Sequence, residues 1–195
     1  PKITQTQIDQ FYFHYPSNAT IVTSHANGKT NAMAVAWHTA VSHDPTYYLV
    51  SISPKRFTHR LVMESGEFVV NFMPAEQGDI IAAVAGCSGK DVDKFAAFGI
   101  ETCPGSHVKA PVLADSLAAY ECKVIDHHTY GDHDLFIGKV LAVQYDSSAY
   151  NERLMLDLAQ RQPILYMGND YYSTAGQSFY LDRQKLVAPA LAKRS

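Results

Sequence analysis

The sequence predicts a mainly β protein, an antiparallel β-barrel with short helices, and two observations lead to this class. From Ala19 onward the chain contains six or more β-prone runs separated by Gly, Pro and Asn turn signals. The helical stretches between them are too short and irregular to serve as the crossovers of a βαβ sandwich. With 195 residues, 47% of them hydrophobic, the chain can bury one sizeable core. We expect a single domain over residues 1–195, with an aromatic arm at 1–18 and a polar tail at 181–195.

Charge and cysteine content exclude several classes of function. The formal net charge of −3 argues against a nucleic acid or an anionic membrane as the main partner. Cys87, Cys103 and Cys122 are odd in number and form no CxxC pair, so neither a zinc site nor a disulfide framework is indicated. No apolar run reaches the ~18 residues that span a bilayer, and no signal peptide is visible. We therefore expect a cytoplasmic protein.

The N-terminal part begins with an arm or short helix that is rich in aromatic residues. Phe11, Tyr12, Phe13 and Tyr15 precede Pro16, and so many aromatic side chains are expected to pack on the body or on a second subunit. A strand at 19–24 follows. The dipeptide at 27–28 is Asn-Gly, which favours a type I′ hairpin turn, so the strand starting at residue 31 should return antiparallel.

The stretch 31–59 combines a surface of small side chains with a possible anion site. Ala32, Ala34 and Ala36 share one face of an extended segment and let a flat molecule lie close to the backbone. After a turn at 42–45 and a β-prone run at 47–52, hydroxyls and cations cluster. These are Ser51, Ser53, Lys55, Arg56 and Thr58. Thr58 is expected to cap a helix over 59–66 that Gly66 stops. The alternative is a plain strand, a solvated loop and a capped helix.

A second possible anion site follows the next strand and helix. The strand at 67–73 contains Asn71, which needs backbone partners, such as those of a neighbouring loop, or the polar edge of a ligand. After a helix at 75–85, Ser88 and Asp91 resemble a capping box. The run Ser-Gly-Lys at 88–90 offers N–H groups, a hydroxyl and an ammonium to an anion, although such a run is commonly a solvated helix start.

The C-terminal half returns to strands. A loop at 98–110 precedes strands at 119–129 and 135–145, and the turn between them places His133 at a rim. The alternative for His133 is a turn histidine bonded to a neighbouring Asp. His127 and His128 would point to opposite faces of a strand, so we expect no metal site. The motifs GxGxxG, GxSxG and HEXXH are absent, which leaves Rossmann, α/β-hydrolase and zincin sites unsupported. Residues 163–180 are rich in Tyr and Gly.

Five blocks in one order resemble a known family. They are NAMAVAWHTAVSHDP, LVSISPKRFTHRLVMESGEFVVNF, SGKDVDKF, YECKVIDHHTYGDHDLFIGKVLAV and PILYMGNDYY. Together they resemble the flavin reductase-like, FMN-binding split-barrel family, and within it the flavoredoxin branch, over residues 12–175. The resemblance implies a six-stranded antiparallel Greek-key split barrel, a homodimer, and FMN bound near the subunit interface.

The resemblance also implies roles for individual residues. Ala36, Trp37, His38 and Thr39 would line the isoalloxazine, and Asn31, at the head of the same block, is included among the cofactor-binding residues. Ser51, Ser53, Arg56 and Thr58 would face the ribityl-phosphate, Asn71 would meet a polar part of the cofactor, and Ser88, Gly89, Lys90 and Lys94 would close over the phosphate. His133 would sit where nicotinamide docks and is the expected catalytic residue. His38 departs from the apolar or aromatic residue expected there, and Cys87 has no assigned role.

Three functions follow as hypotheses. The first is an oxidoreductase that binds FMN, takes electrons from NADH or NADPH, and passes them to free flavin, a ferric chelate or a redox protein. The second is a flavoredoxin-type FMN electron carrier without NAD(P)H activity of its own. The third is a module that stores flavin or binds another ligand. Two phosphate-binding clusters and the lack of an adenosine fingerprint favour FMN over FAD.

Overall fold

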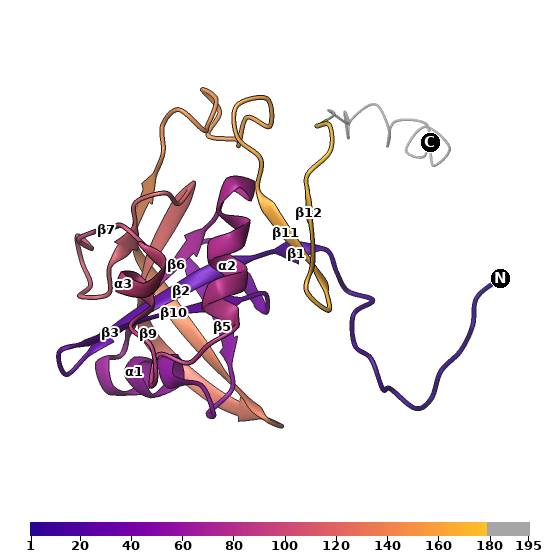
Figure 1. Ribbon diagram of the computed structural model, residues 1–195, viewed down its shortest axis with the longest axis horizontal. Coiled ribbons are helices and arrows are strands. Elements are labelled where there is room, and N and C mark those ends of the chain that lie inside the picture. The colour runs from indigo at the N-terminus through magenta and orange to yellow at the C-terminus, as the bar shows by residue number, and fades with distance from the viewer. Residues whose placement is uncertain (179–195) are drawn as a thin grey trace, which may run out of the picture.

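A seven-stranded antiparallel sheet forms the body of the protein (Figure 1), in a computed structural model that describes residues 1–178. The strand order is β3 (Lys29–Val35), β2 (Thr20–Ala26), β6 (Glu67–Phe72), β9 (Ala118–Tyr130), β10 (His133–Tyr145), β5 (Tyr47–Ile52) and β4 (His38–Ser42). Near the two edges, β3 also contacts β5, so the sheet curls toward a barrel. The predicted mainly β, antiparallel class is confirmed. The main sheet has seven strands instead of six, because the run after Asn31 breaks at residues 36–37 and β4 pairs separately with β5.

Two smaller sheets complete the strands. The first joins β1 (Ser17–Asn18), β11 (Ile164–Gly168) and β12 (Tyr171–Thr174), and the second joins β7 (Thr102–Cys103) and β8 (Val112–Leu113). Figure 1 shows the β11–β12 hairpin on the side of the body from which the N-terminal arm extends. The Tyr-rich end of the chain therefore lies beside the aromatic arm. The predicted tail at 181–195 lies outside the described residues.

Short helices connect the strands. They are α1 (Phe57–Ser65), the 3₁₀ turn η1 (Ala75–Gln77), α2 (Gly78–Ala85) and α3 (Lys94–Phe98). Gly66 ends α1 with φ +67°, as predicted. Two predicted caps are wrong. The cap position of α1 is Arg56, and Thr58 lies buried inside the helix. Asp93, not Ser88, caps α3 by accepting hydrogen bonds from the N–H groups of residues 95 and 96.

Turn chemistry and core packing fix the register of the sheet. Asn27 and Gly28 have φ values of +51° and +71°, which confirms the type I′ turn between β2 and β3. Inside the sheet, Val50, Phe68 and Phe136 belong to one buried cluster. Gly138 lies against this cluster so closely that a Cβ atom there would come 2.6 Å from Cζ of Phe68. The backbone of β10 thus packs directly on the aromatic ring.

A buried carboxylate holds the loop before β8. Glu121 is fully buried and accepts hydrogen bonds from Oγ of Ser106 (2.7 Å), N–H of His107 (2.7 Å) and Nε2 of Gln144 (2.9 Å). Burial raises the pKa of this carboxyl, but these hydrogen bonds outweigh it and lower the pKa to about 2. Glu121 therefore stays ionised and ties the loop to β9.

The aromatic arm is extended and forms no helix. It contacts the body only near the end that leads into β1. The ring of Tyr15 packs on Tyr166 at 5.0 Å, and its hydroxyl accepts a hydrogen bond from Nε1 of Trp37 at 3.0 Å. Farther out, Phe13 is 87% exposed. Packing on the body, one of the two predicted outcomes, holds for Tyr15 and for Tyr12, whose ring lies against Gly168 of β11, and leaves the arm beyond them largely uncovered. Within residues 1–178, every helix is too short or too polar to cross a membrane.

Candidate functional site

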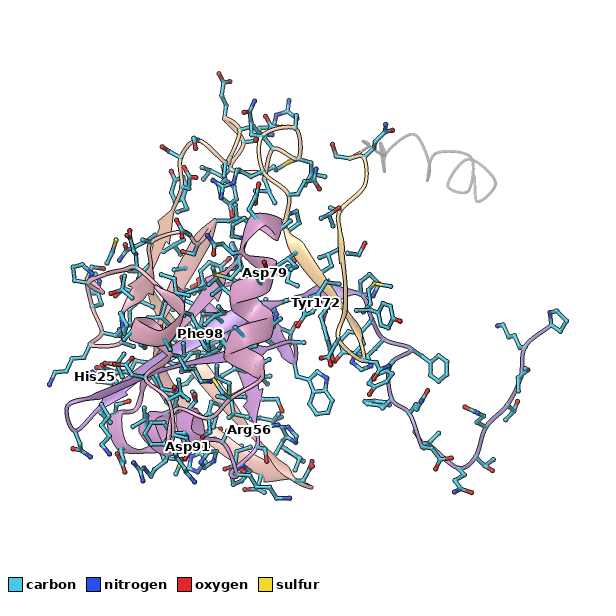
Figure 2. The ribbon with its side chains drawn as sticks, in the orientation of Figure 1. His25, Arg56, Asp79, Asp91, Phe98 and Tyr172 are labelled. Atoms are coloured by element: carbon cyan, nitrogen blue, oxygen red, sulfur yellow. The ribbon has the colours of Figure 1, made fainter. Side chains whose placement is uncertain are left out.

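A cavity of about 400 Å³ brings together six of the predicted cofactor-binding residues. It opens between β3, the start of α1, the end of α2 and the segment before α3, and we call it the cationic cavity. Its lining residues are Asn31, Met33, Ala34, Lys55, Arg56, Phe57, Thr58, Val84, Ala85, Gly86, Cys87, Ser88, Gly89 and Lys94. In Figure 2, Arg56 lies below the C-terminal end of α2. The cavity therefore collects cations, hydroxyls and a glycine loop from four separate segments.

The start of α1 is held in place from two sides. The N–H of Arg56 donates to the carbonyl of Ser53 at 2.9 Å, which forms a tight turn after β5. Nδ2 of Asn31 donates to Oγ1 of Thr58 at 2.8 Å, and both side chains are buried. Asn31 therefore orients the hydroxyl of Thr58, and the turn presents Arg56 to the cavity.

Lys94 supplies a buried ammonium to the same cavity. Its side chain is 4% exposed, and Nζ donates to the carbonyls of Ala32 (2.9 Å) and Val84 (2.7 Å). Burial lowers the pKa of Lys94. An anion in the cavity would favour the charged form, because opposite charges stabilise each other strongly where water is scarce.

The loop at 88–90 closes the cavity at close range. The carbonyl of Ser88 accepts hydrogen bonds from the N–H groups of Asp91 (3.0 Å) and Val92 (3.1 Å), so the loop is a compact turn. A Cβ atom on Gly89 would overlap Oδ1 of Asn31 and lie 2.6 Å from its Cγ. Only glycine fits there without movement of the loop.

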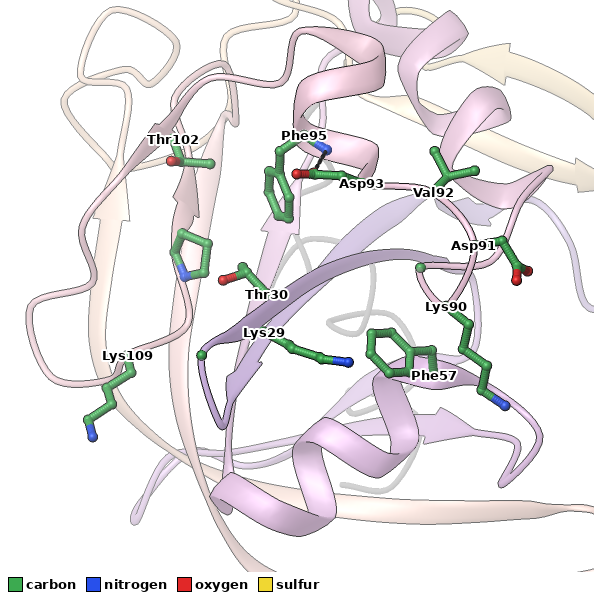
Figure 3. A pocket seen from close by; sticks show the side chains of 13 residues that line it. Lys29, Thr30, Phe57, Lys90, Asp91, Val92, Asp93, Phe95, Thr102 and Lys109 are labelled. Carbon is green, nitrogen blue, oxygen red and sulfur yellow. Dashed lines mark hydrogen bonds between the residues drawn. The ribbon is translucent and has the colours of Figure 1, made fainter.

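Lys90, predicted to close over the phosphate, lines a neighbouring cavity instead. This second cavity, about 640 Å³ in volume, lies across Phe57 and Gly89, which line both cavities. Figure 3 shows Lys29 near the Phe57 ring, with Lys90 and Lys109 at opposite ends of this cavity. The predicted phosphate loop is therefore a wall with Ser88 on one side and Lys90 on the other.

The predicted small-residue surface also lies beside the cationic cavity. Ala34 and Ala85 line both the cationic cavity and a third cavity of about 170 Å³. Ala36 also lines the third cavity, as do Tyr166 and Tyr172 from the β11–β12 hairpin. Figure 2 shows Tyr172 beside α2. Ala32, by contrast, is fully buried in the core.

Trp37 and His133 form an aromatic pair beside the turn that joins β9 and β10, and we call it the rim pair. Their ring centroids are 4.9 Å apart, and the His133 side chain is 25% exposed. Nδ1 of His133 lies 2.8 Å from Oδ1 of Asp132, and this hydrogen bond lowers the pKa of the Asp132 carboxyl. The backbone of Ser51 donates to the carbonyl of Trp37 at 2.9 Å. His133 thus makes the Asp132 contact given as its alternative, and it also packs on a second predicted site residue.

Two predicted cofactor residues have structural roles instead. Asn71 is fully buried; its Nδ2 donates to the carbonyl of Ile21 (2.9 Å), and its Oδ1 accepts from the N–H of Leu113 (2.8 Å). This amide has no exposed edge for a ligand, so the cofactor assignment of Asn71 is corrected. His38 donates from Nε2 to the carbonyl of Asn18 (2.9 Å) and accepts from the Tyr48 hydroxyl at Nδ1 (2.7 Å), because a carbonyl can only accept. Burial lowers the pKa of His38, so the neutral ring bridges β1 and β5.

The remaining predicted residues lie outside the cationic cavity. Thr39 is exposed on β4, and Ser53 is buried, with its carbonyl in the turn to Arg56. Sequence reasoning missed Met33 and Phe57 as lining residues, because apolar side chains carry no ligand signal. Cys87, which had no role, also lines the cavity, and its position directly before Ser88 was the available signal.

Comparison with known proteins identifies the family. A family model described as a flavin reductase like domain matches residues 12–175. The chain belongs to the flavin reductase-like family. An uncharacterised protein of Pyrococcus abyssi is 39% identical over 136 residues, 70% of this chain and 78% of the relative. The structure of an FMN-binding protein from Thermus thermophilus with bound 1-cyclohex-2-enone is 31% identical, with a TM-score of 0.83 over 93% of this chain and 99% of that one. Flavoredoxin from Methanosarcina acetivorans, 24% identical, has the same fold, with a TM-score of 0.84 over 96% of this chain and all of that one.

Proposed function

We propose that this flavin reductase-like protein is an FMN-binding oxidoreductase. It takes electrons from NADH or NADPH at the flavin and passes them to free flavin, a ferric chelate or a redox protein. The observation that carries the proposal is the cationic cavity, which shares Ala34 and Ala85 with the third cavity and its small side chains. The chain also carries the aromatic pair of Trp37 and His133. We place this activity in the cytoplasm.

The residues of the cationic cavity fit the phosphate of FMN. Arg56 and Lys94 supply positive charge, and Thr58 and Ser88 supply hydroxyl donors. A phosphate dianion prefers such converging, charge-assisted donors. The tight contact of Gly89 with Asn31 keeps the loop amides close to the cavity. The FMN-binding protein of Thermus thermophilus, at 31% identity, supports FMN as the ligand.

The rim pair would serve the donor side of the reaction. A bound FMN supplies the exchange of electrons between a nicotinamide donor and an acceptor. Trp37 is 39% exposed, and Asp132 fixes the orientation of the His133 ring. Within residues 1–178, Nε2 of His133 has no hydrogen-bond partner, so it is available to bind a polar group of the donor. An NADH-dependent FMN reductase of Streptomyces nodosus, 30% identical over 128 residues, supports this role.

We also propose that the protein is a homodimer. The outer arm exposes Ile8, Phe11 and Phe13, and the β11–β12 hairpin beside it exposes Met167 and Tyr171. A large exposed apolar patch is typical of an interface. Light scattering of the FMN-bound protein tests this, and a monomer would contradict it.

Two variants test cofactor binding and electron entry separately. Arg56→Ala removes a charge-assisted hydrogen bond of roughly 1.5–3 kcal/mol, so FMN binding should weaken by about ten- to a hundred-fold. His133→Ala should keep FMN bound but slow anaerobic reduction by NAD(P)H in stopped-flow measurements. Arg60→Ala is the control for Arg56, because Arg60 lies on α1 and pairs with Glu64 outside the cavity. His128→Ala on the same hairpin is the control for His133.

The outcomes separate the hypotheses. A colourless protein that takes up no FMN contradicts the cofactor assignment. A yellow wild-type protein that only a protein donor reduces is a flavoredoxin-type carrier. If His133→Ala loses FMN while Arg56→Ala retains it, the assignment of FMN binding to Arg56 and of electron entry to His133 is wrong.

A further inference from the structure

A second histidine–aspartate pair lies inside the body, and its histidine directly follows the predicted phosphate-binding residue Thr58 in the chain. Nε2 of His59, on α1, lies 2.6 Å from Oδ2 of Asp134, on β10. The two side chains are only 13% and 8% exposed. Hydrogen bonding to His59 holds the pKa of Asp134 below its usual range, so the carboxylate is charged at neutral pH. The His59 ring also packs edge-on against Phe136.

This pair closes a short loop of chain that contains the phosphate-binding residues. Asp134 is paired with Ile52, the last residue of β5. The chain leaves β5 after Ile52, forms the turn at 53–56, enters α1, and returns to Asp134 through the His59 side chain. Arg56 and Thr58 both lie inside this closed loop.

We propose that the His59–Asp134 pair positions residues 53–58, so that Arg56 and Thr58 are held ready to bind the phosphate of FMN. This inference rests on the proposed function and adds a positioning pair to it. His59 and Asp134 are absent from the lining of the cationic cavity, so they act through the segment that they hold. A preorganised segment binds more tightly, because less conformational freedom is lost on binding.

Burial distinguishes this pair from a similar one on the same hairpin. His128 and Asp126 are 3.0 Å apart, but their side chains are 62% and 56% exposed. Water competes for that exposed contact. In the buried pair, Oδ1 of Asp134 makes no hydrogen bond within residues 1–178, so the carboxylate depends on the contact of Oδ2 with His59. Loss of His59 would therefore leave a buried carboxylate without its main partner.

For each variant the test measures the FMN dissociation constant, by fluorescence quenching, and the midpoint of urea unfolding of the apoprotein. We expect His59→Leu to weaken FMN binding about tenfold. His59→Gln, which keeps a donor for Asp134, should restore binding to near the wild-type value. His128→Leu is the matched control and should bind FMN as the wild type does.

Two results would overturn the inference. One is an FMN dissociation constant for His59→Leu within twofold of the wild-type value. The other is equal weakening in His59→Leu and His59→Gln, because the ring would then act only by packing. If His59→Leu does not fold, the double variant His59→Leu/Asp134→Leu, which removes the stranded carboxylate, takes its place: about tenfold weaker FMN binding supports the inference, and binding within twofold of the wild-type value overturns it. Failure of the wild type to bind FMN would instead refute the proposed function.

Discussion

Gly89→Ala tests the wall of the cationic cavity at its tightest point. The added Cβ atom would overlap Oδ1 of Asn31 and lie 3.0 Å from Cδ1 of Phe57. Asn31 cannot easily move, because it is buried in β3 and donates to Thr58. The loop at 88–90 must therefore shift away from the cavity.

The size of the effect follows from the donors that move with the loop. Ser88 and the neighbouring amides would lose their alignment with a bound phosphate, and a hydrogen bond to a charged group contributes roughly 1.5–3 kcal/mol. The FMN dissociation constant should then rise about ten- to a hundred-fold, as for Arg56→Ala. The free energy of unfolding of the apoprotein should fall by about 1 kcal/mol, at the low end for overpacking, because a half-buried loop can yield.

A second glycine of the same cavity gives the control. Gly86 lines the cationic cavity, but its added Cβ atom would meet only the carbonyl oxygens of Ala82 and Ala83, at 3.5 and 3.6 Å. Its φ of −75° suits alanine. Titration of each apoprotein with FMN, followed by flavin fluorescence, compares the two variants. If Gly89→Ala binds FMN as tightly as Gly86→Ala, the loop does not form the phosphate wall.

Two further predictions concern stability. Because the pKa of Glu121 is about 2 in the folded chain against 4.5 ordinarily, its ionisation stabilises the fold above pH 4.5 by about 3 kcal/mol, and this contribution is lost as the pH falls toward 2. Urea unfolding should therefore show a large deficit for Glu121→Gln at pH 7 that narrows at pH 3, and an equal deficit at both pH values would contradict the reasoning. Gly138→Ala would place a Cβ atom 2.8 Å from that of Cys122, so we expect a loss of about 1–3 kcal/mol in thermal unfolding. Unchanged FMN affinity in that variant would separate core packing from the site, and an unchanged melting temperature would refute the packing argument.

Local sequence signals predicted the strands and turns well. The β-prone run at 47–52 matches β5 at both ends, and Asn27, Gly28 and Gly66 adopt the positive φ angles that their turns require. These features depend on backbone preferences of a few adjacent residues. Such preferences are readable without knowledge of the fold.

Roles set by distant partners could not be read in the same way. Thr58 has a side chain that is typical of a helix cap, but the helix begins earlier, at Phe57. The Thr58 hydroxyl instead accepts a hydrogen bond from Asn31, 27 positions away. For Asn71 the sequence left two alternatives, backbone partners or the polar edge of a ligand, and only the fold shows that the partners are Ile21 and Leu113. The His59–Asp134 contact joins residues 75 positions apart, and neither residue type indicates the other. The family resemblance named six residues that line the cationic cavity, but it also named Asn71 and His38, whose side chains are hydrogen-bonded within the fold.

The origin of the cavity walls has a consequence for the lifetime of the protein. β3, the start of α1, the end of α2 and the segment before α3 come together only in the folded chain, so a ligand that fills the cationic cavity binds the folded state alone. By mass action, such a ligand at a hundred times its dissociation constant adds about 2.7 kcal/mol to the free energy of unfolding. That amount lowers the unfolded fraction about a hundred-fold. Ligand supply would then set how much of the chain is open to proteases at any moment, and cells short of the ligand would hold less of the protein at an unchanged rate of synthesis.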